Sequence, residues 1–333
     1  MSGTTAGLLP KIQGFSRKMP KVRDLLILAI LFVALVPILR IFRVTQFMIF
    51  CIFVMSLDLL YGFMGYLSFG HVLYLGVGVY GSILFSVYIN TNPILSIVAG
   101  VLAGLLLSGI LGSFLVELKG AAFALTNMAF NYIGYFLIRS TFQKITYGDD
   151  GLSSKVMPWG FLNFSNETVA YVFVLICFLG VFFLLRNLVD SPFGVIVKSI
   201  KEKETRVRFL GYNTYKYKWI TYMIAGTIAS FAGTLDTLYL QYVSPTFIHP
   251  LTNIEPVFSI LIGGAGNLYG AIAGGMVYML LRDWLSTIVV QWEWILGIIL
   301  LLVVFWFRTG LVGFVKNLVA TLRFRIKKKG MRR

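Results

Sequence analysis

Long hydrophobic stretches, separated by short polar interruptions, run through most of the chain. They begin near residues 25, 44, 66, 94, 120, 168, 218 and 285, and a further stretch at 254–281 is interrupted by glycines. A helix of about 20 residues crosses the roughly 30 Å of hydrocarbon in a membrane. The pattern therefore predicts an all-α polytopic membrane helix bundle with about 8 full spans plus broken or re-entrant half-helices.

The longest charged interruption, residues 186–218, contains eight Lys or Arg residues. Apolar residues recur within it at roughly helical spacing, namely Phe193, Ile196, Val197, Ile200, Val207 and Leu210. This pattern predicts an amphipathic helix lying against another surface. We expect this segment to meet a soluble partner.

Composition and charge support a membrane location. Hydrophobic residues make up 58% of the 333 residues and charged residues 13%. The net charge of +16 is concentrated, with five basic residues in 1–23, eight in 186–218 and eight in 316–333. These basic blocks flank the spans and lack interleaved aromatic residues, so we expect no nucleic-acid partner. They are expected to contact membrane lipid instead.

The positive-inside rule places the three basic blocks on the cytoplasmic side of the plasma (inner) membrane. The predicted organisation is a cytoplasmic basic N-terminal segment at 1–23, a transmembrane domain at 24–310 and a cytoplasmic basic tail at 311–333. Within the domain, 139–167 is an external loop and 187–217 a cytoplasmic loop. No cleavable signal peptide is evident, so the first span is expected to remain as an anchor. Cys51 and Cys177 lie within spans and indicate neither a disulfide nor a metal site.

Glycine-rich interruptions occur in both halves of the chain, at 61–85 and at 254–281. Broken helices expose backbone donors and acceptors at membrane depth, so such a pair indicates a transport pathway. The alternative is that the glycines only allow close helix packing.

Ionisable residues inside a membrane are costly and therefore candidates for function. Asp58 and Asp236 fall within spans, and His71 lies in the first glycine-rich segment. The alternatives are a structural pair or cap for the two aspartates, and a hydrogen-bonded interior position for the histidine.

Three motifs resemble the permeases of branched-chain amino acid ABC transporters, in particular the longer, M-type subunit of the LIV family. The first is Leu67–His71 followed by Gly76, Gly78 and Tyr80. The second is SPFGVIVKSIKEKETRVRFLGYN with the span behind it, and the third joins YVSPTF at 242–247 to IGGAGNLYGAIAGG at 262–275. A smaller match is Gly148, Asp150, Gly151 and Leu152 in the external loop. The resemblance covers about residues 45–310.

The resemblance implies a transport subunit, not an enzyme, that works with two ABC ATPase subunits, a second permease subunit and an external solute-binding protein. No cofactor is expected on this chain, which has no G-x-x-x-x-G-K-[ST] loop to hold ATP. The implied substrate pathway involves Ser68, Gly70, His71, Gly264, Gly266 and Asn267. The implied ATPase-coupling residues are Glu202, Glu204 and Gly211. We expect Arg206 and Arg208 to take part in the same contact and to set the choice of partner.

We expect the coupling helix to present its apolar face to a groove on the ATPase, with Gly211 ending the helix. The alternative is a helix lying on anionic lipid headgroups. The chain departs from the family at Asp58, where Asn is usual, and at Arg206, Val207 and Arg208, where small or acidic residues are common.

The predicted function is import of branched-chain amino acids or a related small polar solute, such as urea or a short amide. The alternative is an ion-coupled secondary transporter with Asp58, Asp236 and His71 as the coupling groups. A membrane enzyme is disfavoured because no His, Cys or carboxylate residues cluster with catalytic spacing.

Overall fold

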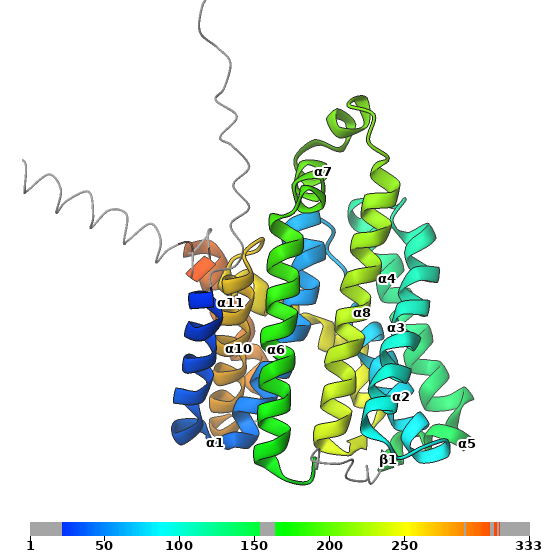
Figure 1. Ribbon diagram of the computed structural model, residues 1–333, viewed down its shortest axis with the longest axis vertical. Coiled ribbons are helices and arrows are strands. Elements are labelled where there is room, and N and C mark those ends of the chain that lie inside the picture. The colour runs from blue at the N-terminus through cyan, green and yellow to red at the C-terminus, as the bar shows by residue number, and fades with distance from the viewer. Residues whose placement is uncertain (1–21, 154–163, 290, 307–309, 312, 314–333) are drawn as a thin grey trace, which may run out of the picture.

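The computed structural model describes residues 22–153, 164–289, 291–306, 310–311 and 313. The predicted basic segments at both termini therefore lie almost wholly outside the described residues. The described chain forms an elongated bundle of helices (Figure 1). Its helices in chain order are α1 (Val22–Asp58), η1 (Leu59–Met64), α2 (Val72–Tyr88), α3 (Pro93–Leu115), α4 (Gly120–Phe136), η2 (Leu137–Thr141), α5 (Gln143–Thr146), η3 (Gly148–Asp150), α6 (Glu167–Asp190), α7 (Pro192–Phe209), α8 (Thr214–Leu240), η4 (Pro245–Ile248), η5 (Pro250–Asn253), α9 (Ile254–Gly263), α10 (Leu268–Ile288) and α11 (Trp292–Trp306). Strands β1 (Leu152–Ser153) and β2 (Tyr242–Val243) pair antiparallel, with Leu152 opposite Val243.

The all-α membrane bundle is confirmed, whereas the predicted count of about eight full spans is not. In the described part, five helices are long and apolar enough to cross a membrane, and the bent pair formed by η5–α9 and α10 makes a sixth at most. Two expected spans are short, because α2 has 17 residues and α11 has 15. The expected spans at 25–42 and 44–64 are counted together in the 43-residue stretch Val22–Met64, but a kink at Arg40 separates two helices within it.

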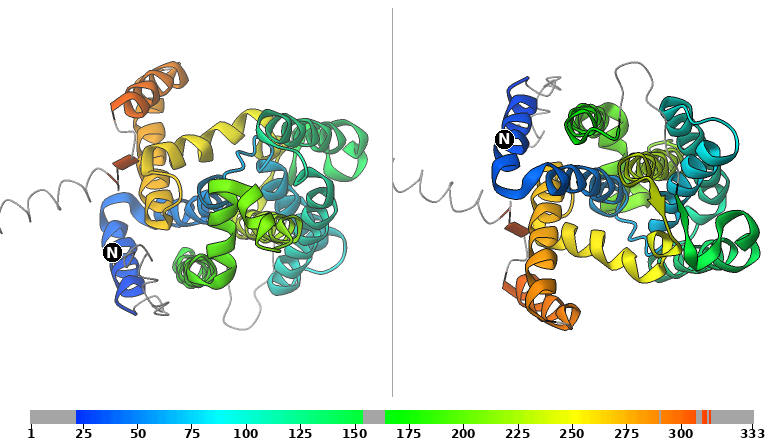
Figure 2. Two further views of the ribbon diagram at one scale, coloured as in Figure 1. Left: turned by 90° about the horizontal axis from the view of Figure 1, so that it is seen from above. Right: turned by 90° about the horizontal axis from the view of Figure 1, so that it is seen from below.

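A kink divides α1 into two arms. Arg40 has φ 66° and ψ 152°, values outside the helical region, and Pro37 lies just before it. A proline inside a helix removes one backbone hydrogen bond and crowds the preceding turn, so bending is expected here. The first arm runs to the lower end of the view in Figure 1, and the second returns toward α7. Figure 2 shows the first arm and α11 at the rim of the bundle.

Close packing around α8 forms the centre of the bundle. A Cβ added at Gly78 of α2 would lie 2.0 Å from the carbonyl oxygen of Ser230, and one at Gly233 would lie 2.1 Å from that of Leu75. Ser230 Oγ also donates a hydrogen bond to the carbonyl of Tyr74 (2.6 Å). Small residues thus let the helix backbones approach closely, which is how helices associate where lipid offers no hydrophobic driving force.

The predicted interruption at 254–281 is present. Helices α9 and α10 are bent by 119° with respect to each other, and the break between them contains Gly264 and Gly266 with φ of 104° and 80°. Asn267 begins α10, and its side chain accepts a hydrogen bond from Tyr269 N (3.3 Å). Only α9, with 10 residues, is a half-helix, because α10 has 21 residues and continues to Ile288. The last helix therefore begins at 292 and not at 285.

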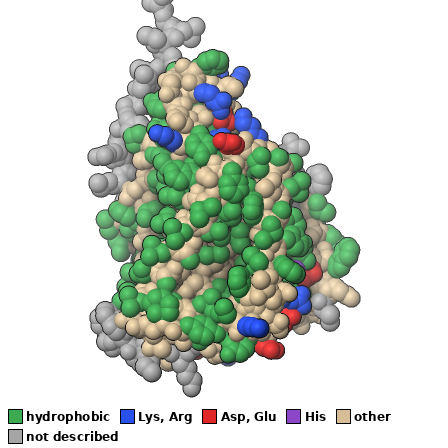
Figure 3. Space-filling model, turned by 90° about the vertical axis from the view of Figure 1, so that its right-hand side faces the viewer, with side chains coloured by type: hydrophobic (Ala, Val, Ile, Leu, Met, Phe, Trp, Pro, Cys, Tyr) green, Lys and Arg blue, Asp and Glu red, His purple; other side chains and the backbone are tan. Residues whose placement is uncertain are grey.

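The surface has the character of a membrane protein. On the face in Figure 3, hydrophobic side chains cover the middle, and charged side chains of both signs lie at the two ends, with Lys and Arg gathered at the end that carries α7. We call these two ends the α7 end and the distal end.

Candidate functional site

Asp58, at the end of α1, closes the break between α9 and α10. Its Oδ1 accepts a hydrogen bond from Gly266 N (2.8 Å), across 208 residues of sequence. The contact is tight, because a Cβ added at Gly62 would lie 2.0 Å from Asp58 Oδ1 and 2.2 Å from Gly266 N. An unpaired backbone N–H at membrane depth costs several kcal/mol. Asp58 therefore acts as a cap of the break.

The charged helix α7 reaches the same place. Lys201 Nζ donates a hydrogen bond to the carbonyl of Gly62 in η1 (2.6 Å). Lys201, Gly62, Asp58 and Gly266 thus form a continuous series of contacts from α7 to the break, which we call the α7–break link. Its two hydrogen bonds join residues that are 139 and 208 positions apart in the sequence.

The other group of predicted pathway residues lies on a different side of α1. His71 Nε2 is 2.8 Å from Ser56 Oγ, its ring stacks on Phe53 with centroids 5.5 Å apart, and it has no exposed surface. Ser68 is likewise fully buried, and Gly70 packs against the backbone of Asn127. The surroundings of His71 thus fit the alternative expectation, a hydrogen-bonded histidine in the protein interior.

The two groups of predicted pathway residues contact α1 at Ser56 and Asp58. Positions two residues apart point about 200° apart around an α-helix. The contact of His71 with Ser56 therefore lies on another side of α1 than the contact of Asp58 with the break at 264–267. The contribution of both groups to a pathway stays a prediction.

Buried polar contacts link the spans near the start of α2, and sequence reasoning missed them. Tyr222 donates to Asn127 Oδ1 (2.5 Å) and pairs with the hydroxyl of Tyr74 (2.7 Å). Nearby, Asn253 accepts a hydrogen bond from Val72 N (2.9 Å) and donates to Asn131 (2.5 Å). Asn127 and Asn131 within an apolar stretch are the signal that would have indicated this network, because a side-chain amide in a span needs partners.

A cavity of about 290 Å³ lies toward the distal end, between α1, α2, α8, α9, α10, η4 and η5. Its polar lining residues are Gln46, Asp236, Thr246, Thr252, Glu255 and Arg282. Arg282 Nη1 donates to Glu255 Oε2 (3.1 Å). Asp236 makes no hydrogen bond or ion pair with any residue that the structure describes. Of the two predicted intramembrane aspartates, one therefore caps a helix break and the other lines this cavity, so they do not form a pair.

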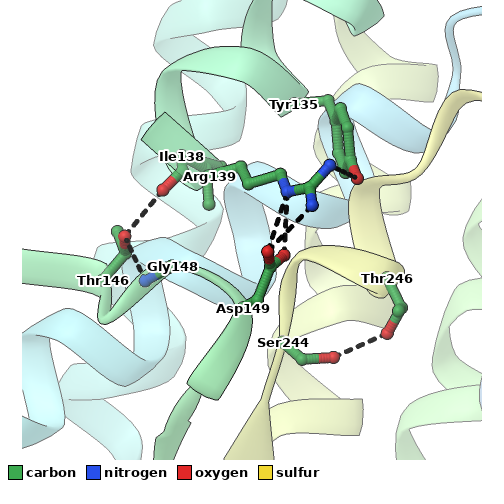
Figure 4. A network of polar contacts seen from close by, with 8 residues as sticks. All are labelled: Tyr135, Ile138, Arg139, Thr146, Gly148, Asp149, Ser244 and Thr246. Atoms are coloured by element: carbon green, nitrogen blue, oxygen red, sulfur yellow. Dashed lines mark hydrogen bonds and ion pairs between the residues drawn. The ribbon is translucent and has the colours of Figure 1, made fainter. Parts of the chain in front are cut away.

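A polar network at the distal end adjoins this cavity (Figure 4). Thr246, which lines the cavity, is hydrogen-bonded through its hydroxyl to Ser244 (2.6 Å). Arg139 pairs with Asp149 (2.9 Å) in the segment predicted as the external loop. The pairing of β1 with β2 connects that segment to the chain just before η4. Residues 154–163 of the predicted loop lie outside the described residues.

At the α7 end, the apolar face of α7 lies against the bundle, contrary to the expected exposure to a partner. The helix begins at Ser191, whose side chain accepts a hydrogen bond from Gly194 N (3.3 Å). Val197, Ile200 and Val207 are buried, with 2–4% exposure. An amphipathic pattern indicates that one face is covered but not by which surface. In this structure the covering surface is the helix bundle of the same chain.

The exposed apolar residues of this segment are at its tip instead. Phe209 is 93% exposed and Leu210 is 71% exposed. The helix is interrupted at Lys203, where the backbone is extended, and Gly211 follows it with φ of 86°, a conformation that glycine adopts without strain. Phe209 and Leu210 lie beside Lys203, Thr205 and Arg206 around a shallow hollow. We call these five residues the α7 tip.

Glu204 holds this segment in place and is not part of the exposed tip. Its carboxylate forms ion pairs with Lys119 (3.1 Å), Lys218 (3.1 Å) and Arg208 (2.9 Å), and it accepts from Thr214 (3.1 Å). Partial burial alone would raise the pKa of Glu204, but the hydrogen bonds and charges of Lys218 and Lys119 outweigh it and hold the pKa at about 2. Glu202, by contrast, is exposed.

Comparisons with known proteins agree with this architecture. The family model described as "Branched-chain amino acid transport system / permease component" matches residues 39–305. The chain is 25% identical to the branched-chain amino acid transport permease protein LivM of Methanocaldococcus jannaschii, over 73% of this chain and 80% of that protein. It is 24% identical to LivM of the high-affinity branched-chain system of Escherichia coli, over 78% of this chain and 66% of that protein.

More distant relatives include the nucleoside ABC transporter permease protein NupC of Lactococcus lactis, with 22% identity over 61% of this chain and 68% of that protein. No solved structure matches the chain. Because the family model covers more than half of the sequence, the chain belongs to the family of branched-chain amino acid transport system permease components.

Proposed function

We propose that this chain is the membrane subunit of an ABC importer for branched-chain amino acids or a related small polar solute. In this proposal an external solute-binding protein delivers the substrate at the distal end. Two ATPase subunits act at the α7 end, which faces the cytoplasm, and a second permease subunit completes the pathway. The observation that carries the proposal is the family match over residues 39–305. The concentration of basic residues at the α7 end supports the orientation, by the positive-inside rule.

The ATPase would dock on the α7 tip. A large apolar side chain that is almost fully exposed to water is costly unless a partner covers it, and Phe209 is 93% exposed. The neighbouring Lys203 and Arg206 add positive charge that would orient an acidic rim on the partner. Glu204 and its ion pairs would keep the tip in a fixed position.

The α7–break link would carry movement from the ATPases into the membrane. A displacement of α7 acts on Gly62 through Lys201, and Gly62 packs directly against Gly266 in the break. A glycine-rich break can change its backbone angles with little steric resistance. Movement of α7 would therefore displace η1, and η1 would in turn open or close the pathway at the break.

The arrangement does not favour an ion-coupled transporter. That alternative requires Asp58, Asp236 and His71 to act together, but Asp58 is hydrogen-bonded to the break, Asp236 lines the cavity, and His71 is buried against Ser56. Urea or a short amide stays open as a substrate class at the level of the family.

Reconstitution of the whole transporter tests the proposal. The chain, its second permease and the two ATPases are placed in liposomes, with the binding protein outside and ATP inside. We expect uptake of radiolabelled L-leucine that requires both ATP and the binding protein. Uptake that follows a proton or sodium gradient in the absence of ATP would overturn the proposal.

A further inference from the structure

We propose that the distal cavity is a transient binding site for the zwitterion of an amino acid with an aliphatic side chain. The inference rests on the proposed function and names the substrate class within it. The cavity, of about 290 Å³, has the volume of roughly ten water molecules at about 30 Å³ each. That is enough for a small amino acid and too little for a peptide of several residues.

Two charged groups in the cavity suit the two ends of a zwitterion. Asp236 lines the cavity without a partner among the described residues, so its carboxylate is available to an ammonium group. Arg282 donates a hydrogen bond to Glu255 and its Nε lies 3.8 Å from Asp283 Oδ1, and a guanidinium carries five N–H donors. Its remaining donors are available to a carboxylate, which arginine binds well.

The charges that face Asp236 across the cavity explain why a zwitterion is favoured over an anion. Glu255 and Arg282 come from α9 and α10 and largely compensate each other, with Nη1 and Oε2 3.1 Å apart. Asp283, next to Arg282, faces Arg43 at 4.0 Å and Arg282 Nε at 3.8 Å. The cavity lining thus has two carboxylates against one guanidinium. A ligand without a positive group would give Asp236 no partner, whereas an ammonium group would compensate its charge.

The remaining wall of the cavity is apolar. It includes Ile49 and Phe53 from α1, Leu75 from α2 and Met279 from α10. An aliphatic side chain would find hydrocarbon contacts here, whereas the hydroxyls of a sugar would find few partners. The same wall gives little reason to retain urea or a short amide, because these solutes lack both the charged head and the apolar side chain.

The geometry also predicts weak and brief binding. Arg282 is already paired with Glu255, so a substrate carboxylate must share the guanidinium with it. Release then restores an existing contact, which suits a pathway better than tight capture does. The cavity adjoins η4, whose Thr246 belongs to the distal polar network in Figure 4, the end at which a binding protein would deliver the substrate.

Cysteine protection tests binding directly and without transport. In the reconstituted complex, Gln46→Cys, which lines the cavity, is labelled with a thiol reagent in the presence of millimolar ligands. We expect L-leucine to slow the labelling at least threefold, and 4-methylpentanoate, 3-methylbutylamine and D-ribose to have little effect. Asp236→Asn should abolish the protection by leucine. Protection by ribose, or equal protection by leucine in the Asp236→Asn variant, would overturn the proposal.

Uptake assays separate failure of this site from failure of the proposed function. We expect Asp236→Asn and Arg282→Met each to lower ATP-driven leucine uptake at least tenfold while the complex assembles normally. Glu293→Gln removes one negative charge from the same end at an exposed position outside the cavity, and should transport like the parent. Absence of ATP-driven leucine uptake in the parent defeats the proposed function. Normal uptake in Asp236→Asn defeats only the site.

Discussion

The α7 end and the distal end use charged residues in opposite ways. At the α7 end, Glu204 is surrounded by Lys119, Lys218 and Arg208, and Lys201 is bonded to a backbone carbonyl. At the distal end, Asp236 faces a cavity without a described partner. Satisfied charges hold a structure in one arrangement, whereas an unsatisfied one is a place for a ligand. Under the proposed function, the comparison teaches that the paired charges of the α7 end would transmit movement, whereas Asp236 at the distal end would receive a solute.

The largest expected effect comes from Gly62, which contacts both Lys201 of α7 and Gly266 of the break. In Gly62→Ala, the new methyl group would overlap Asp58 Oδ1 and Gly266 N. We expect a loss of stability of about 3 kcal/mol or more, because overpacking and a broken buried hydrogen bond act together. Gly180→Ala is the matched control, since a Cβ there meets nothing within 4 Å. Folded yield and thermal unfolding in detergent measure both variants. Equal stability of the two would show that the break is not closed against η1.

The next effect should appear when the α7 tip is made polar. In the double variant Phe209→Ser with Leu210→Ser, both replaced side chains are largely exposed, so the fold is retained. We expect the amount of ATPase that co-purifies with the chain to fall at least tenfold. Leu251→Ser changes an exposed leucine at the distal end and should leave the association intact. Unchanged association in the double variant would move the docking surface away from the tip.

A smaller and more selective effect is expected for Lys201→Met, which keeps the alkyl chain and removes the hydrogen bond to Gly62. The complex should assemble and hydrolyse ATP, but leucine uptake per ATP should fall severalfold because movement of α7 is no longer passed to η1. Lys216→Met, at an exposed position near the start of α8, should behave like the parent. A parallel loss of ATP hydrolysis and uptake in Lys201→Met would indicate an assembly defect instead of lost transmission.

The smallest effect concerns Glu204 and depends on pH. Glu204→Gln should lower stability by about 1–3 kcal/mol at neutral pH, because hydrogen bonds to a charged group are lost, whereas the exposed Glu202→Gln should change it little. The folded pKa of Glu204, about 2, lies below its ordinary value of 4.5. Its contribution is therefore complete above pH 4.5 and is lost as the pH falls from there toward 2.

Thermal unfolding of the parent and of Glu204→Gln across this pH range measures that contribution. The two midpoints should converge on acidification. A constant difference between them would contradict the assignment of Glu204 as the ionised centre of the cluster.

Local patterns in the sequence predicted the features that depend on nearby residues. The apolar stretches fixed the fold class, the glycines at 263–270 placed the break, and Gly211 marked the end of α7. Each of these depends on backbone preference or on burial of a helix face, which neighbouring residues reveal. The kink at Arg40 had a local signal in Pro37, and it separates the two apolar stretches that were predicted as separate spans.

The features that could not be predicted join residues far apart in the chain. Asp58 and Gly266 are 208 residues apart, and Asp236 shares a cavity with residues of α1, α2, α9 and α10. Arg282 was missed because an arginine at the end of an apolar stretch usually marks the edge of a membrane. The burial of Val197 and Ile200 against the bundle of the same chain could not be predicted either. Helical periodicity indicates that one face of a helix is covered, but it does not indicate which surface covers it.

The exposed tip has a consequence for the life of the protein before assembly. A chain inserted without its ATPases presents Phe209 and Leu210 to water on a projecting segment, and such an apolar patch is a target for chaperones and proteases and a start point for aggregation. If the ATPase docks on the tip as proposed, this signal disappears on assembly. Exposure of these two side chains would thus distinguish an incomplete transporter from an assembled one. Permease subunits without an ATPase would then be degraded, and more of them would be lost when the ATPase is scarce.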